Sequence, residues 1–96
     1  MVTEFAQIEV KPGMEQSFIE GVEKSRPLFL AATGCHSMGL QRSIEEPEKF
    51  LLVVQWEQVE DHMVHFRQSE AYQLWRGHVG HCFASPPVVW HGQTVV

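Results

Sequence analysis

Two polar side chains interrupt otherwise apolar faces of predicted helices, and they are the groups most able to do chemistry. The first is His62, which shares one face, at the 3.6-residue spacing of a helix, with Val59, Met63 and Phe66. An imidazole has a reference pKa of about 6.5, so an inward-pointing His62 could act as a general acid or base near neutral pH. A buried histidine that only caps a backbone carbonyl is the alternative.

The second is Arg76, which lies in the next apolar stripe. That stripe follows Ser69, a predicted helix N-cap, and contains Tyr72, Trp75, Val79 and Phe83. A guanidinium at the edge of such a stripe could neutralise a phenolate or enolate oxygen. Alternatively, its stem packs on the helix and its charged end reaches a carboxylate in solvent.

Aromatic side chains near these groups could line a pocket for a flat ring. The candidates are Phe18, Trp56, Phe66, Tyr72 and Trp75. His91, on the last predicted strand, is a further candidate, although the sequence leaves open which sheet face it occupies. His36 is a weaker candidate of the same kind. The alternative for the aromatic residues is an ordinary hydrophobic core.

The remaining histidines do not predict a metal site. His62 and His65, and likewise His78 and His81, are spaced three residues apart on predicted helices, as two metal ligands can be. Only His62 of the first pair points inward, and no third ligand falls at a matching interval. We therefore expect the other three to be solvated and predict neither a metal nor another cofactor. No glycine-rich phosphate loop or nucleophile elbow is present either.

The elements that must position these groups follow from hydrophobic periodicity. Residues Glu4 to Val10 alternate, with Ala6, Ile8 and Val10 on one face, and predict a strand. A helix is predicted from Met14 to Ala32, with a kink at Pro27 or a restart in which Ser25 is the cap. Gly34 is expected to end it in the left-handed conformation.

Three further strands complete the predicted fold. They run from His36 to Ser43, from Phe50 to Val54 with Trp56 at the end, and from Val88 to Val96 after Pro86-Pro87. The resulting order, β-α-β-β-α-β, predicts an α+β ferredoxin-like split βαβ fold with a four-stranded antiparallel sheet. Because the second of these strands is apolar on both sides, the sheet face without helices needs a cover, and a second copy of the chain is the simplest one.

Composition narrows the classes of partner. The 96 residues suit one domain, residues 1–96, with 44% hydrophobic and 20% charged residues. A net charge of −5 with only seven Lys and Arg excludes a basic surface for nucleic acid. No apolar run approaches the length of a membrane span, so we expect a cytoplasmic protein that does not bind membranes. Cys35 and Cys82 are expected to be free thiols.

The run from Phe50 to Phe83 resembles the antibiotic biosynthesis monooxygenase family. The matching residues are Trp56, His62, Phe66-Arg67-Gln68-Ser69, Tyr72, Trp75 and Pro86-Pro87-Val88-Val89-Trp90-His91. This resemblance implies a homodimer that forms an α+β barrel, with a pocket between the helices and the sheet in each subunit. The haem-degrading branch of the family is disfavoured, because Gln7, Phe66 and Trp75-Arg76 replace its characteristic Asn, Trp and His.

The resemblance implies a cofactor-independent monooxygenase that acts on a small phenolic or quinol-type aromatic compound with dioxygen. In this hypothesis His62 helps to remove a proton from the phenol and Arg76 stabilises the anion that results. Two alternatives stay open: a non-catalytic protein that binds a small hydrophobic ligand, and a cofactor-free isomerase or decarboxylase.

Overall fold

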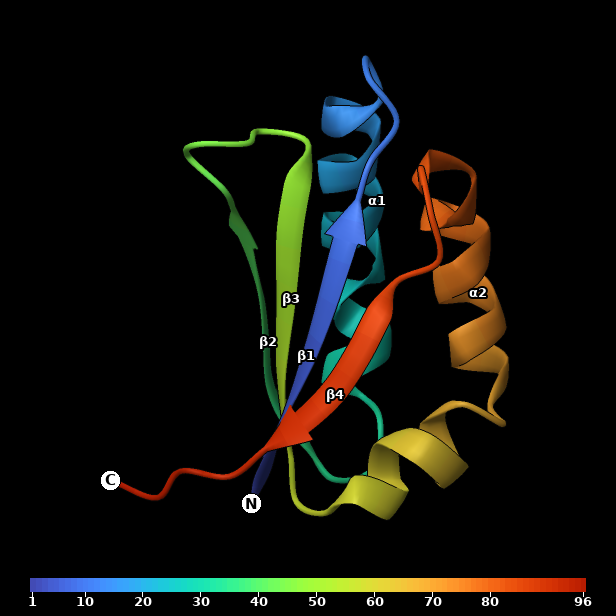
Figure 1. Ribbon diagram of the computed structural model, residues 1–96. Coiled ribbons are helices and arrows are strands. Elements are labelled where there is room, and N and C mark those ends of the chain that lie inside the picture. Colours follow the sequence, from blue (N-terminus) through green and yellow to red (C-terminus); the bar gives the residue numbers. More distant parts are fainter.

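The chain forms four antiparallel strands and two long helices in the predicted order (Figure 1). The computed structural model describes all residues from 1 to 96. The elements are β1 (Val2–Glu9), α1 (Glu15–Leu30), β2 (Cys35–Arg42), β3 (Lys49–Trp56), α2 (Glu70–Val79) and β4 (Val88–Gly92). A π-helical turn, Asp61–Phe66, precedes α2, and a short 3-10 turn, Gly80–Cys82, follows it.

The sheet order is β2-β3-β1-β4, which confirms the ferredoxin-like fold. The central strands are β1 and β3, and β3 is the most apolar of the four. Their register places Glu4 opposite Val54, and on the other side of β1 it places Glu4 opposite His91 of β4. Residues directly opposite each other in a sheet point to the same face, so Glu4 and His91 share the face that carries the helices.

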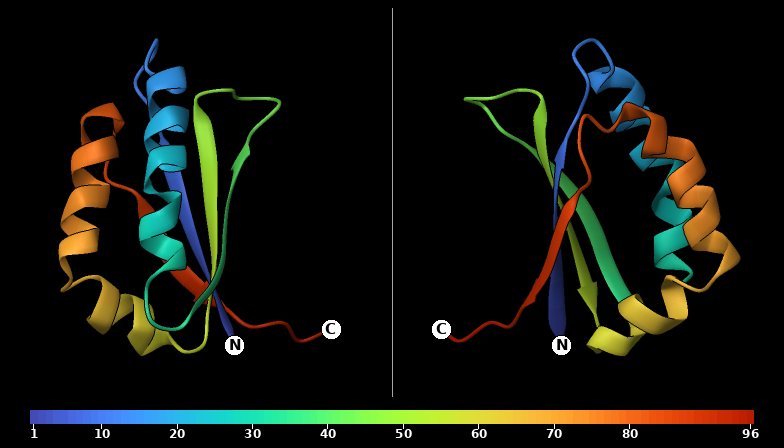
Figure 2. Two further views of the ribbon diagram at one scale, coloured as in Figure 1. Left: turned by 180° about the vertical axis from the view of Figure 1, so that it is seen from behind. Right: turned by 45° about the vertical axis from the view of Figure 1, so that its right-hand side comes forward.

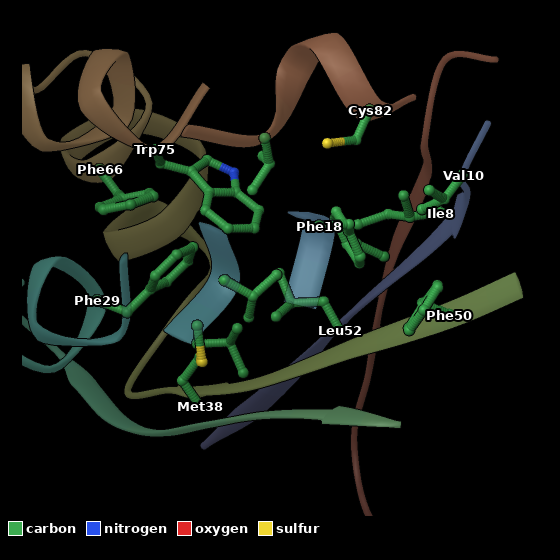
Figure 3. Packing of buried hydrophobic residues seen from close by; sticks show 14 of the residues in the cluster. Ile8, Val10, Phe18, Phe29, Met38, Phe50, Leu52, Phe66, Trp75 and Cys82 are labelled. Carbon is green, nitrogen blue, oxygen red and sulfur yellow. The ribbon is translucent and has the colours of Figure 1, made fainter. Parts of the chain in front are cut away.

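Both helices pack on one face of the sheet, which gives two layers (Figure 2). The layer between them is a cluster of 15 buried residues, of which Figure 3 labels ten. Phe29 of α1 lies 4.7 Å from the ring of Phe66 and 5.0 Å from that of Trp75. These ring contacts join α1 to the π-helical turn and to α2, and they hold the second helical segment against the first.

Helix α1 excludes one of the two alternatives predicted at Pro27, a restart with Ser25 as the cap. The helix continues through this proline to Leu30, and the Ala31 backbone N–H still donates to the Pro27 carbonyl oxygen at 3.0 Å. Pro27 itself has no N–H, so one backbone hydrogen bond of the helix is lost. Ser25 is therefore not a cap: its hydroxyl donates to the Gly21 carbonyl oxygen at 2.8 Å and lies 2.7 Å from Nδ1 of His78. The prediction that His78 is solvated is wrong, since it bridges the two helices.

The last strand is shorter than predicted. It ends at Gly92, opposite Thr3 of β1. Because β1 begins one residue earlier, at Val2, residues 94–96 have no part of β1 opposite them. Gly34 does adopt the predicted left-handed conformation, with φ of 82°. Its Cα also lies so close to the side chain of Asp61 that no Cβ could be accommodated there.

The face of the sheet without helices carries apolar side chains. Phe5 and Trp90 stack on it with ring centroids 4.4 Å apart, and Trp90 remains 48% exposed. Val88, on the same face of β4, is 59% exposed.

None of the helices is long and apolar enough to span a bilayer.

Candidate functional site

A cavity of about 570 Å³ lies between the helical layer and the sheet. Its floor comes from β1 and β3, its walls from the π-helical turn and α2, and its rim from residues 83–87 and 89. Of the residues singled out from the sequence, the cavity brings together His62, Phe66, Tyr72, Trp75 and Arg76. The volume is sufficient for a one- or two-ring compound.

Glu4, on the floor of this cavity, is the residue that the sequence interpretation missed. It is only 4% exposed, and Oε1 accepts a 2.9 Å hydrogen bond from the indole Nε1 of Trp56. The alternation along β1 indicates this position, because Glu4 is two residues from Ala6 and four from Ile8 and so points to the same inward face as they do. A carboxyl group at an inward position of an apolar strand is unusual unless it is paired or functional.

His62 lies against this carboxyl group and is itself 3% exposed. Its Nε2 is 3.4 Å from Oε1 of Glu4, and its Nδ1 is 2.9 Å from Nε2 of His91. The imidazole stacks on the indole of Trp56, with ring centroids 5.6 Å apart and planes 16° from parallel. Glu4, His62 and His91 therefore form a continuous array from the cavity floor to the half-buried His91 on β4.

Burial sets the protonation of this array. Loss of water raises the pKa of Glu4 to about 7, an effect that the Trp56 hydrogen bond and the positive charge of Arg67 only partly offset. Burial, together with the neighbouring His91 and Arg67, lowers the pKa of His62 to about 4. Burial also lowers the pKa of His91. At neutral pH His62 is thus a neutral imidazole, and Glu4 is the group that titrates.

The π-helical turn fixes where His62 points. Its wide winding is marked by the hydrogen bond from the Arg67 backbone N–H to the His62 carbonyl oxygen, five residues back, at 3.1 Å. The turn starts at the buried Asp61, whose carboxylate accepts from the Gln58 backbone N–H at 3.2 Å and packs against Gly34. The glycine, the aspartate and the turn together hold His62 over the sheet.

The wide turn also brings Arg67 into the cavity wall. An α-helix would separate residues five apart by about 140° around its axis, but the π-helical bond stacks Arg67 above His62. Arg67 lines the cavity, and its Nε is buried without a hydrogen-bond partner. Sequence periodicity missed Arg67 because an α-helical pattern places it on the outer side.

Arg76 lies at the mouth of the cavity and is exposed. It donates to the hydroxyl of Tyr72 at 3.3 Å, and its guanidinium carbon lies 5.4 Å from the centre of the Phe83 ring. This arrangement combines both readings of Arg76, since the stem packs at the rim while the charge faces the opening.

Four of the residues proposed from the sequence do not line the cavity. Trp56 lies beneath its floor, where it supports Glu4 and His62, and His91 touches His62 from the far side. Phe18 is fully buried at the other end of the core, 4.9 Å from the ring of Phe50. His36 is exposed and lies 2.6 Å from Glu57, away from the cavity.

No group of three or more His, Cys, Asp or Glu side chains is arranged to hold a metal ion.

The fold and cavity define a class of small ferredoxin-like proteins that have an aromatic-lined cavity between helices and sheet. Residues 1–77 match the model of the antibiotic biosynthesis monooxygenase family, and the chain belongs to this family. Membership supports a general monooxygenase-like role.

Relatives extend this likeness over nearly the whole chain. A Bordetella bronchiseptica protein with the same family designation is 54% identical, and its crystal structure covers 99% of this chain and 97% of its own with a TM-score of 0.98. A Nitrosomonas europaea protein with that designation shares the fold at 18% identity, with complete coverage of both chains and a TM-score of 0.85. The YczJ protein of Bacillus subtilis (strain 168) is 36% identical over 95 residues, 99% of this chain and 100% of its own.

Proposed function

We propose that the protein is a cofactor-independent monooxygenase that oxidises a small phenol or quinol with dioxygen. The observation that carries this proposal is the buried array of Glu4, His62 and His91 at the end of an aromatic-lined cavity. Activation of such a substrate requires removal of a proton in a place that water cannot reach. The array is a buried acceptor with a route for the proton to leave.

In this mechanism the Glu4 carboxylate accepts the phenolic proton. A base whose pKa lies near the working pH is the most effective general base, and burial brings the pKa of Glu4 to about 7. His62, which is neutral, can take the proton from Glu4 through Nε2 while Nδ1 releases one to His91. His62 thus keeps the proton-transfer role expected from the sequence, but as the partner of a carboxylate.

The walls of the cavity stabilise the anion that remains. Phe66 and Trp75 are almost fully buried and hold a flat ring away from water. Arg76 at the mouth supplies a positive charge, and Tyr72, which accepts its hydrogen bond, fixes its direction. The electron-rich anion is oxidised more easily than the neutral phenol. The cavity must therefore stabilise the anion without preventing it from passing an electron to dioxygen.

The reaction balances with the substrate as the only reductant. The quinol anion passes one electron to dioxygen, and the resulting pair combines to form a carbon–oxygen bond and a hydroperoxide. The oxygen–oxygen bond then breaks as the distal oxygen leaves with protons as water. A quinol and one dioxygen give one hydroxyquinone and one water.

The test is dioxygen uptake by the purified protein over a panel of quinols, anthrones and catechols, with His62→Ala as the matched variant. We expect turnover with one labelled oxygen atom in the product, and a fall of about a hundredfold or more in the variant, the usual effect of losing acid–base assistance. If no substrate raises uptake above its own autoxidation, the oxygenase proposal is wrong. Substrate conversion that continues without oxygen would indicate an isomerase or decarboxylase instead, and binding without conversion a ligand carrier.

We also propose that two copies of the chain form a homodimer through the open sheet face, which closes the α+β barrel. The exposed Trp90 and Val88 and the Phe5–Trp90 stack form an apolar surface that a second sheet could cover. Light scattering should give twice the mass of the chain, and Trp90→Glu should shift it toward the monomer. A wild-type protein that is monomeric at assay concentrations would contradict this assembly.

A further inference from the structure

We propose that Arg67 binds an anionic oxygen group of the substrate, so that the cavity selects aromatic compounds that carry a carboxylate or a phenolate. This inference depends on the proposed function only in taking the cavity as the substrate site. It assigns to Arg67 the role of a specificity-determining residue next to the Glu4–His62 pair.

The first support is that Arg67 has no partner within the protein. Its Nε–H is sealed from water and makes no hydrogen bond, and no carboxylate forms an ion pair with its guanidinium. Arg76, by contrast, contacts Tyr72 and Phe83, and Arg42 donates from Nε to the Pro47 carbonyl oxygen at 2.7 Å. The buried Nε–H cannot be reached by a ligand, but the terminal nitrogens of Arg67 are not buried and make no hydrogen bond within the protein, so they are suited to an incoming acceptor.

The second support is position. The π-helical bond from Arg67 to His62 places the two side chains on the same side of the turn, so both line the cavity. The charge of Arg67 also acts on Glu4, His62 and His91, which places it within electrostatic reach of the whole array. An anion held by Arg67 therefore lies beside the group that removes the proton.

The third support is electrostatic balance. An anionic substrate entering beside the Glu4 carboxylate meets a like charge in a place with little water, which is unfavourable without a nearby cation. Arg67 is that cation. When the anion neutralises Arg67, the positive charge that lowers the pKa values of Glu4 and His62 is offset, so both become stronger bases in the complex.

Binding of inert ligands tests this inference without relying on turnover. The probes are 2-naphthoate and its neutral counterpart 2-naphthamide, and their binding is measured by calorimetry. Binding of 4-nitrophenol at a pH below and at a pH above its own pKa tests recognition of a phenolate. The variants are Arg67→Gln, Arg67→Lys and, as a matched control that removes one positive charge outside the cavity, Arg26→Gln. Circular dichroism and thermal melting establish that each variant is folded.

The wild type should bind the carboxylate at least about tenfold more tightly than the amide, the effect of one good charge-assisted hydrogen bond. That ratio should fall to within about twofold in Arg67→Gln, recover in part in Arg67→Lys, and stay unchanged in Arg26→Gln. Preference for ionised nitrophenol but not for naphthoate assigns Arg67 to a phenolate, and the reverse assigns it to a carboxylate.

Equal binding of naphthoate and naphthamide by the wild type, or binding of neither, together with no preference for ionised nitrophenol, overturns the inference. An anion preference that survives in Arg67→Gln overturns it as well. The proposed function can fail separately. Anion selectivity through Arg67 without any oxygen uptake contradicts the oxygenase alone, and oxygenation of a carboxylate-bearing quinol with the same rate and KM in Arg67→Gln as in the wild type contradicts the role of Arg67 alone.

Discussion

The two ends of the interior between helices and sheet are built from similar aromatic residues but have different surroundings. At one end Phe18 is fully buried and packs against Phe50 and Phe83, with ring centroids 4.9 and 6.3 Å away. Figure 3 shows Phe18 and Phe50 at this end. At the other end Phe66 and Trp75 border an open cavity that also contains buried Glu4 and His62. Aromatic content alone therefore does not identify a binding site.

The difference lies in the polar groups that each end buries. Strand β1 contributes to both ends, with Val10 at the apolar end and Glu4 at the other. A buried carboxyl group costs free energy that the apolar residues do not, and this cost appears as the raised pKa of Glu4. Proteins retain such costs chiefly where they serve function, which makes the Glu4 end the reactive one.

The largest expected effect comes from removing the carboxylate at the reactive end. Glu4→Gln keeps the shape and can still accept from Trp56, but it cannot take a proton at neutral pH. We expect the oxygenation rate to fall by about 10²–10⁴-fold, the range for a lost general base. Steady-state oxygen uptake measures this, with melting temperature as the control for folding. A rate within tenfold of wild type would assign proton removal to another group.

The free energy of unfolding should depend on pH through both buried groups, and their two contributions should change in opposite directions as the pH rises. Protonated Glu4 stabilises the fold below its unfolded pKa of about 4.5, and this contribution is lost as the pH rises through about 7. His62 destabilises the fold when protonated, so its contribution is present above its unfolded pKa of 6.5 and is lost as the pH falls through about 4. Each contribution is about 3 kcal/mol at 1.36 kcal/mol per pKa unit.

Urea unfolding of wild type and single variants separates these two contributions. The stability of wild type minus that of His62→Gln should rise between pH 4 and 6.5, while wild type minus Glu4→Gln should fall between pH 4.5 and 7. In the wild type the two slopes largely cancel from pH 4.5 to 6.5. Differences that do not vary with pH would mean that neither group is buried as described.

The smallest expected effect on activity is at the apolar end. Phe18→Leu removes a ring from the filled core, so the free energy of unfolding should drop by about 1–3 kcal/mol while turnover and KM stay within about twofold of wild type. Chemical denaturation and oxygen uptake on the same sample provide the comparison. An increase in KM of tenfold or more would restore Phe18 to the substrate site.

Hydrophobic periodicity predicted most of the fold because alternation and helical stripes determine which faces are buried. The order of elements, the inward position of His62 and the left-handed Gly34 all follow from such local rules. Boundaries that depend on partners were less accessible: β4 ends at Gly92, opposite Thr3, where β1 is within one residue of its own start. The continuation of α1 through Pro27 likewise depends on where the helix ends.

The site was only half predictable for a geometrical reason. Residues on regular elements, such as Tyr72, Trp75 and Arg76 on α2, kept the positions that their spacing implies. Arg67 did not, because the π-helical turn changes which residues share a face, and no local sequence signal predicts that turn. Glu4 was accessible from the alternation of β1, but a charged residue near the end of a strand is usually solvated.

The most direct test of the account is the pH dependence of kcat/KM for oxygenation in wild type, Glu4→Gln and Trp56→Phe. In the wild type kcat/KM should rise about tenfold per pH unit below about 7 and level off above it, as Glu4 loses its proton. In Trp56→Phe the midpoint should move to higher pH, since the indole hydrogen bond that lowers the pKa of Glu4 is gone. In Glu4→Gln this limb should disappear, leaving only any ionisation of the substrate itself. A limb that persists unchanged in Glu4→Gln would contradict the central claim that the buried Glu4–His62 pair removes the substrate proton.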